Sequence, residues 1–141
     1  MNLGTIQAMK DGSPKTGILL FAHGSRVEEA NEGVRSLAQQ VQQPGGFSYV
    51  RAAFLEMAEP DLRRAIAEAV AAGLDRIIVV PYFLTMGIHL RRDLPGLLAR
   101  ERASHPGVEF RVTEPLQGHP LLPTLLLDRI RAAAEKGGAN K

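Results

Sequence analysis

Three residues of the types that bind metals or carry protons recur at regular intervals along the chain. His23, Glu56 and His89 each follow a short apolar segment, and the steps from 23 to 56 and from 56 to 89 are 33 residues each. Loops that follow parallel strands converge beyond the carboxyl ends of those strands, so we expect the three residues to share one rim of a sheet. Two imidazoles and a carboxylate, with no sulfur, suit a divalent first-row metal whose remaining coordination positions stay open.

Each of the three residues also has an ordinary interpretation. A lone histidine after a strand is more often an exposed or hydrogen-bonded residue than a ligand. Glu56 could simply favour the positive N-terminal end of the next helix, and His89 could be a first-turn surface residue. The equal spacing follows partly from regular strand-helix units, but the coincidence of three ligand types on one rim still favours a site. Glu114 shares that rim as a reserve candidate, whereas His119 is expected to be a helix-entry residue and His105 to lie on the opposite rim.

The candidates depend on four strands that alternate with four helices. Apolar runs predict strands over residues 17–22, 47–54, 74–81 and 108–113. Residues 77–80, an unbroken run of isoleucine and valine, suit a strand that is buried on both faces of a parallel sheet. Helical periodicity predicts helices over residues 26–43, 60–72, 87–104 and 120–136. This alternation predicts an α/β three-layer sandwich with a mainly parallel four-stranded sheet.

Proline and glycine mark the expected ends of these helices. Pro44 and the two glycines after it predict the end of the first helix, and Pro60 is expected in the first turn of the second. Gly73 is a natural C-terminal cap, and Pro95 could kink the third helix. The fourth helix carries one apolar face, made of Leu122, Leu125, Leu126 and Ile130.

Composition limits the classes of protein that the chain can belong to. Its 141 residues predict one domain over 17–135, with a flexible leader over 1–16 and a frayed tail over 136–141. The formal charge of +2 gives no reason to expect a nucleic-acid partner, and no apolar run approaches the roughly 20 residues of a membrane span. The absence of cysteine excludes thiolate ligands and fits a cytoplasmic protein.

Several familiar catalytic motifs are absent. Ser25 has no G-x-S-x-G elbow around it, and Ala22 stands where the nucleophilic motif of the histidine phosphatases has arginine. A flavodoxin-like phosphate-binding module would require a glycine-rich first loop, and the sequence offers only Gly24 there.

Four stretches taken together resemble the small sirohydrochlorin chelatases, the short CbiX-type and SirB-type members of the class II chelatase family. These stretches are LLFAHGSRVEEAN, AFLEMAEPDLRRAI, RIIVVPYFLTMGIHLRRDLP and PLQGHPLL, and the match runs from about residue 17 to 130. The resemblance implies a chelatase-like fold and insertion of Co²⁺ or Fe²⁺, or Ni²⁺ in some relatives, into a tetrapyrrole that carries many carboxylates. The metal is then a substrate, no cofactor is permanently bound, and the physiological metal and the pathway stay open.

The resemblance also implies roles for individual residues. His23 and His89 match the two active-site histidines of the family, and Glu56 matches its acidic metal-site residue. Histidine titrates near neutral pH, so either imidazole could bind the metal or accept a proton, and the sequence does not say which does which. The candidates for contacts to the substrate are Ser25, Arg26, Arg91 and Arg92. Guanidinium groups suit its carboxylates because they bind them through two parallel hydrogen bonds.

A homodimer is expected for a chain of this length. Relatives of about twice the length have two such domains that face each other across one cleft, and a symmetric pair would supply the second wall for a macrocycle. The apolar segment 82–88 is the candidate contact surface, unless it only covers the core. The alternative function is a non-catalytic carrier of metal or tetrapyrrole on the same fold, because fold alone does not dictate turnover.

Overall fold

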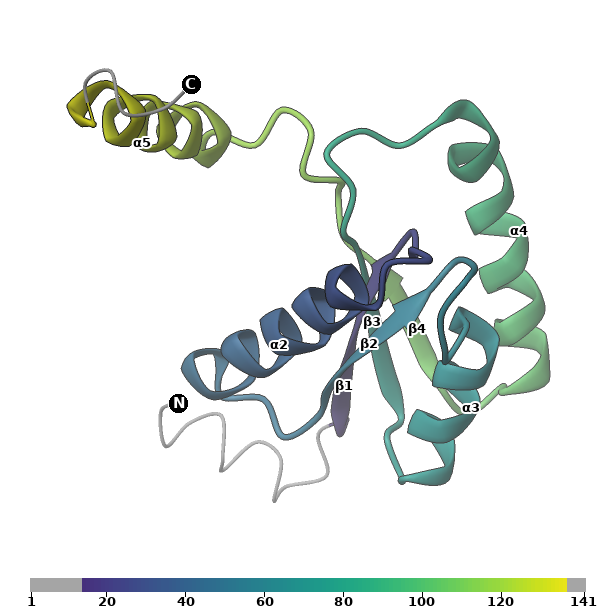
Figure 1. Cartoon of the computed structure of the whole chain (residues 1–141). Coiled ribbons are helices and arrows are strands. Elements are labelled where there is room, and N and C mark those ends of the chain that lie inside the picture. Colours follow the sequence, from purple (N-terminus) through teal and green to yellow (C-terminus); the bar gives the residue numbers. More distant parts are fainter. Residues whose placement is uncertain (1–13, 137–141) are drawn as a thin grey trace.

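Strands and helices alternate along the chain as predicted. The computed structural model describes residues 14–136 (Figure 1). Its elements are β1 (Thr16–Ala22), α2 (Glu28–Gly45), β2 (Val50–Phe54), α3 (Leu62–Ala71), β3 (Arg76–Pro81), α4 (Ile88–Ser104), β4 (Glu109–Val112) and α5 (Leu121–Glu135). The four strands form one parallel sheet in the order β2-β1-β3-β4. The predicted α/β sandwich with a parallel four-stranded sheet is confirmed.

The core lies on both faces of β1 and β3, which are the central strands of the sheet. Leu19 and Phe21 of β1 belong to the larger cluster, with Ile66 of α3 and Leu98 of α4. The alternate residues of β1 face the other way and pack against α2, where Ala38 is buried. Because side chains alternate along a strand, this double burial explains the unbroken apolar run of β1. The predicted burial of both faces of β3 is only partly correct, since Ile77 and Val79 are buried whereas Ile78 and Val80 are partly exposed.

Pro44 and Pro60 do not mark the helix boundaries as predicted. Pro44 does not end α2, which continues through it to Gly45. The helix ends instead at Gly46, whose φ of 73° is left-handed and whose amide donates to the carbonyl of Gln43. A left-handed C-cap satisfies the last carbonyls, and glycine adopts it without strain. Pro60 is likewise outside α3, because the Asp61 carboxylate caps that helix by accepting from the amide of Arg64 at 2.8 Å.

The predicted terminal segments fall largely outside the described residues. Residues 1–13 of the predicted leader and 137–141 of the predicted tail are not described, and Thr16 already belongs to β1. The division into leader, single domain and tail therefore stays a prediction. Within residues 14–136, none of the helices combines the length and the apolar character that crossing a membrane requires.

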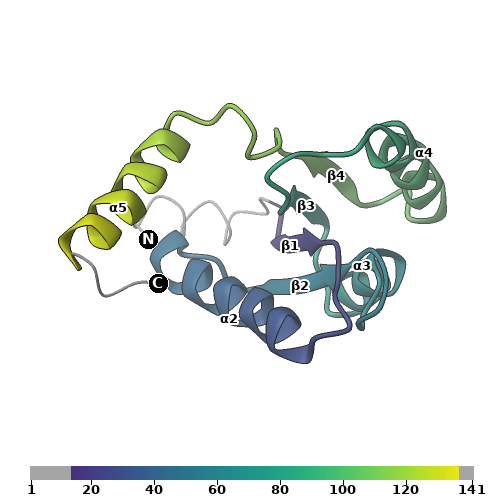
Figure 2. The ribbon, with the colours of Figure 1, turned by 45° about the horizontal axis from the view of Figure 1, so that its top comes forward.

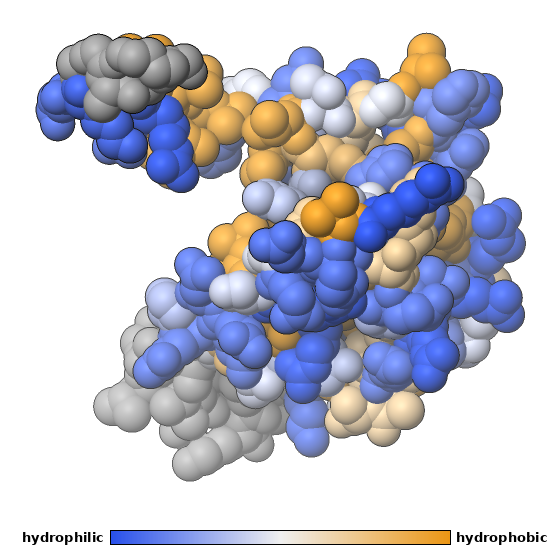
Figure 3. All heavy atoms as spheres, in the orientation of Figure 1, coloured by the Kyte–Doolittle hydropathy of each residue, from blue (hydrophilic) through white to orange (hydrophobic). Residues whose placement is uncertain are grey.

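The last helix, α5, stands apart from the rest of the fold. Figures 1 and 2 show it at the end of an extended connection, clear of the sheet and of the other helices. None of its residues is buried, and Figure 3 shows apolar atoms at its surface. The apolar face that the sequence predicts for this helix therefore does not join the core of its own chain.

Candidate active site

His23 and Glu56 meet at the carboxyl ends of β1 and β2. His23 directly follows the last residue of β1, and Glu56 lies two residues beyond the last residue of β2. The pairing of the two strands continues past their ends, because the Leu55 amide donates to the Ala22 carbonyl at 2.8 Å and the Glu56 amide to the His23 carbonyl at 3.1 Å. This backbone pairing brings His23 Nε2 to 3.7 Å from Glu56 Oε2.

The geometry of the two exposed side chains suits a metal ion. His23 Nδ1 lies 3.1 Å from the carbonyl oxygen of Gly24. A carbonyl only accepts, so Nδ1 carries the proton, and the lone pair of the neutral ring is on Nε2, the atom nearest Glu56. Two ligands bound to one ion at about 2.1 Å are about 3.0–3.4 Å apart, so a small movement lets both atoms bind the same metal.

The loop between His23 and α2 is held by the buried side chain of Asn31. Its amide nitrogen donates to the carbonyl of Ser25 at 2.8 Å and to Glu28 Oε1 at 3.1 Å, while its Oδ1 accepts the Ser25 amide at 2.9 Å. Ser25 Oγ accepts the amide of Val27 at 3.0 Å. The Ser25 hydroxyl, predicted as a substrate contact, thus stabilises the turn that presents His23.

Arg35, which no sequence motif indicated, also stabilises the loops of the site. Its guanidinium donates to Glu28 Oε2 at 2.7 Å and to the carbonyl of Glu59 at 3.2 Å, and it lies over the ring of Phe54. It therefore ties α2 to the loop that carries Glu56. The hydrogen bonds from Arg35 and Asn31 hold the pKa of Glu28 below its usual range. The guanidinium of Arg35 also donates to the carboxylate of Glu32. The helical spacing of Glu28, Glu32 and Arg35 is the sequence signal for this ion-pair cluster.

His89 does not lie beside the His23–Glu56 pair in this structure, so its place among the metal ligands stays a prediction. Within the part of the chain that the structure describes, no three His, Asp or Glu side chains lie close enough together to hold a metal. The steps of 33 residues match, but β3 ends at Pro81, and His89 lies eight residues further on, in the first turn of α4. A longer loop after β3 therefore displaces this histidine from the strand end.

The neutral ring of His89 is the opposite tautomer to that of His23. Its Nδ1 lies 3.0 Å from a guanidinium nitrogen of Arg92. A guanidinium only donates, so this Nδ1 accepts, and in the neutral ring the proton is on Nε2. In this arrangement neither ring nitrogen of His89 offers a free lone pair to a metal.

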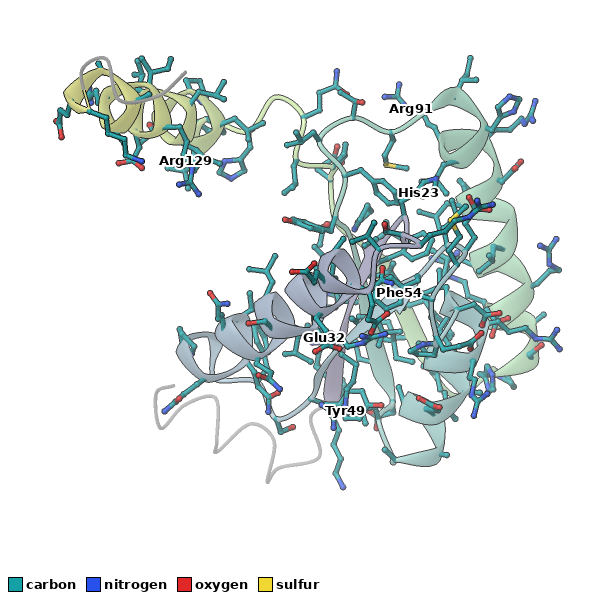
Figure 4. All side chains as sticks on the ribbon, viewed as in Figure 1. His23, Glu32, Tyr49, Phe54, Arg91 and Arg129 are labelled. Atoms are coloured by element: carbon teal, nitrogen blue, oxygen red, sulfur yellow. The ribbon has the colours of Figure 1, made fainter. Side chains whose placement is uncertain are left out.

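The other predicted arginines are differently placed. Arg26 and Arg91 are exposed and form no ion pair with any residue in 14–136. The guanidinium of Arg92 instead donates to His89 and lies 3.4 Å from the carboxylate of Asp93. Arg91 lines a cavity of about 550 Å³ between α4 and the ends of β3 and β4. Glu114, the reserve acidic candidate, lines the same cavity rather than the His23–Glu56 pair. Figure 4 shows His23 and Arg91 at the same end of the molecule.

The remaining histidines have local structural roles. His119 Nδ1 accepts the amide of Leu121 at 3.0 Å, so this residue stabilises the start of α5. His105 follows α4 and lies 3.7 Å from Glu101. Neither histidine contributes to the pair at the end of β1.

Comparison with known proteins places the chain in a family. The CbiX family model matches residues 17–133, which include His23, Glu56 and His89. The chain belongs to the CbiX family.

Relatives within and around this family have similar sequences and folds. A sirohydrochlorin cobaltochelatase of Methanopyrus kandleri is 32% identical over an alignment 136 residues long, gaps included, and the match spans 82% of this chain and 95% of the relative. A chloroplastic sirohydrochlorin ferrochelatase of Arabidopsis thaliana is 34% identical over 115 residues, and the match spans 82% of this chain but only 51% of that protein. The crystal structure of a putative cobalamin biosynthesis CbiX protein from Marinobacter aquaeolei VT8 superimposes with a TM-score of 0.74 at 33% identity, covering 86% of this chain and 98% of that one.

Proposed function

We propose that this chain is a chelatase that inserts Co²⁺ or Fe²⁺ into sirohydrochlorin or a close relative of it. The observation that carries the proposal is the His23–Glu56 pair, whose Nε2 and Oε2 atoms lie 3.7 Å apart on an open rim. Family membership supports it, since the relatives reported above are named as cobalt and iron chelatases of sirohydrochlorin.

The pair fits the first requirement of metal insertion, which is a metal held loosely. Two protein ligands leave several coordination positions for water and then for the pyrrole nitrogens. A closed four-ligand site of the structural type would retain the ion. We assign His23 Nε2 and Glu56 to the incoming metal, because the Nδ1–H of His23 is already committed to the Gly24 carbonyl.

The second requirement is an acceptor for the two protons that leave the macrocycle. We assign one of these transfers to His89. Arg92 donates to His89 Nδ1 at 3.0 Å. When a substrate carboxylate draws Arg92 away, the Nδ1 lone pair becomes free to accept a proton. Arg26 and Arg91, which have no acidic partner within residues 14–136, are assigned to other carboxylates of the substrate.

Turnover separates this proposal from the alternative of a non-catalytic carrier. The purified protein is mixed with an excess of sirohydrochlorin and with Co²⁺, Fe²⁺ or Ni²⁺ in turn, and the visible spectrum is followed against protein-free controls. A chelatase converts many equivalents of macrocycle per chain faster than the control. Binding of one equivalent with no acceleration would leave the carrier as the correct function.

We further propose that the working form is a homodimer in the cytosol. The segment 82–88 supports the dimer, because Tyr82, Leu84 and Ile88 are 40%, 67% and 78% exposed. Phe83 and Met86, from the same segment, instead pack against the core. The cytosolic location rests on the absence of cysteine from the full sequence, and cell fractionation tests it.

A further inference from the structure

The two loops that carry the candidate metal ligands are joined where they leave the sheet. The Glu56 amide donates to the His23 carbonyl at 3.1 Å, which fixes the backbone beneath the two side chains. The residues that follow, 24–27 and 57–61, continue beyond the strand ends. Ligands on such loops keep a defined separation only where surrounding side chains hold the loops in place.

Asn31 is a buried polar residue near the start of α2, and its side chain holds the loop that follows His23. It is 2% exposed, and its three hydrogen bonds reach the amide and the carbonyl of Ser25 and the carboxylate of Glu28. Asparagine is a weak helix former, and a buried amide costs free energy unless its hydrogen bonds are made. An apolar side chain is the usual occupant of a buried helix position, so the contribution of Asn31 is the fixed position of the loop.

Arg35 continues this connection to the loop that follows β2. Its guanidinium donates to Glu28 Oε2 at 2.7 Å, while Asn31 donates to Oε1 of the same carboxylate at 3.1 Å. A second nitrogen of the guanidinium donates to the carbonyl of Glu59 at 3.2 Å. The group also lies 5.3 Å from the ring centre of Phe54, the last residue of β2. A planar fork of donors can hold two acceptors at once, which a single ammonium group does less well.

These hydrogen bonds form one continuous chain between the two loops. It runs from Ser25 through the side chains of Asn31, Glu28 and Arg35 to the carbonyl of Glu59, and we call it the Asn31–Arg35 network. Its two ends lie two residues after His23 and three residues after Glu56. Figure 1 shows that α2 begins beside the carboxyl ends of β1 and β2, where the network crosses. The loops are therefore held both at the sheet and beyond it.

We propose that Asn31 and Arg35 are positioning residues that set the separation of His23 Nε2 and Glu56 Oε2, and through it the affinity of this pair for a divalent metal ion. The two atoms lie 3.7 Å apart, close to the separation of two ligands of one ion. Binding by a pair that is already in place loses less conformational freedom, so its affinity is higher. The inference rests on the proposed function, because it takes His23 and Glu56 as the residues that bind the incoming metal.

Two substitutions break the network and keep the size or the charge of the side chain. Asn31→Asp retains the acceptor for the Ser25 amide but places an oxygen against the Ser25 carbonyl and the Glu28 carboxylate. Arg35→Lys retains the positive charge but loses the fork of donors. Each should weaken Co²⁺ binding about tenfold in the absence of tetrapyrrole, because residues that orient metal ligands typically contribute about 10–100-fold to affinity. The titration is followed by the paramagnetic broadening of histidine ring signals in NMR spectra.

Arg76→Lys is the matched control for Arg35→Lys. The side chain of Arg76 is 27% exposed against 32% for Arg35, and it donates to Glu109 Oε1 at 3.1 Å. It lies at the start of β3, at the opposite end of the sheet from His23 and Glu56. Urea unfolding should show a similar loss of stability in the two lysine variants, whereas the Co²⁺ affinity of Arg76→Lys should equal that of the wild type.

The effect of the network should also depend on the second ligand. In a Glu56→Ala background there is no pair whose separation can be set, so adding Asn31→Asp should change the Co²⁺ affinity less than about twofold. General loss of stability would weaken binding equally in both backgrounds. An equal effect in both backgrounds would overturn the inference, and so would wild-type Co²⁺ affinity in folded Asn31→Asp and Arg35→Lys.

The same titration separates a failure of this inference from a failure of the proposed function. Wild-type Co²⁺ affinity in both His23→Ala and Glu56→Ala would show that the pair does not bind the metal, which overturns the metal assignment and the inference together. Weakened binding in these two variants, with wild-type affinity in Asn31→Asp and Arg35→Lys, would overturn the inference alone.

Discussion

The carbonyl oxygen of Glu56 lies in the space where a side chain on Gly24 would begin. A Cβ atom on Gly24 would be 1.7 Å from that oxygen, and the φ of Gly24 is +91°, a conformation that other residues adopt only with strain. The close approach accompanies the hydrogen bond from the Glu56 amide to the His23 carbonyl. The glycine after His23 therefore permits the contact between the two loops that carry the candidate ligands.

Gly24→Ala should separate these loops and lose most of the metallation activity. The strained φ alone costs about 1–3 kcal/mol of folding free energy, and the clash with a backbone atom adds to it. Gly33→Ala is the matched control. Gly33 is exposed within α2, a Cβ there meets nothing within 4 Å, and alanine should stabilise the helix by about 0.5–1 kcal/mol. Urea unfolding and the chelatase assay compare the two variants, and full activity in Gly24→Ala would contradict the model of the loop contact.

Variants of His23 and His89 should differ in their affinity for Co²⁺ when the metal is titrated in the absence of tetrapyrrole. His23→Ala and Glu56→Gln should each weaken Co²⁺ binding at least about tenfold, because each removes one of two ligands. His89→Ala should leave Co²⁺ binding nearly unchanged, since Arg92 occupies its Nδ1. Both histidine variants should nevertheless lose most metallation activity. Wild-type metallation by a folded histidine variant would rule out the role assigned to that histidine.

Arg26 and Arg91 should act mainly on substrate affinity. Arg26→Ala and Arg91→Ala should each raise KM about 3–10-fold with a smaller change in kcat, because a contact made equally in ground and transition states is lost. Arg63→Ala, an exposed arginine of α3, serves as the control and should leave both constants unchanged. Steady-state metallation kinetics decide this, and an unchanged KM in both test variants would identify Arg26 and Arg91 as ordinary surface charges.

Low pH should weaken the hydrogen bonds that Glu28 makes with Arg35 and Asn31 next to the His23 loop. The hydrogen bonds from Arg35 and Asn31 lower the pKa of Glu28, so the carboxylate contributes stability above the ordinary glutamate pKa and loses it as the pH falls through the lowered value. Glu28→Gln should therefore be less stable than the wild type at pH 7 and lose less stability between pH 7 and pH 3. Urea unfolding at both pH values tests this. A difference between the two proteins that is the same at both pH values would mean that the Glu28 charge has no part in it.

Local residue patterns are sufficient to predict the layers of the fold and one half of the candidate site. The apolar runs and the helical periodicity predict strands and helices that alternate around a parallel sheet, because both patterns are local properties of the sequence. His23 could be placed at a strand end because it directly follows the apolar run of β1. Pairing of β1 with β2 then brought Glu56 to it, as parallel topology predicts.

The positions of His89 and α5 depend on the three-dimensional paths of two loops, which local residue patterns do not specify. The interval of 33 residues counts chain length, whereas the position of His89 depends on the path of residues 82–87, which carries it from the strand end into α4. The apolar face of α5 can be recognised from its spacing, but periodicity does not identify the surface that covers it. That depends on where the segment 113–120 directs the helix. Spacing determines which side chains share a face, and the three-dimensional path of the loops determines what that face meets.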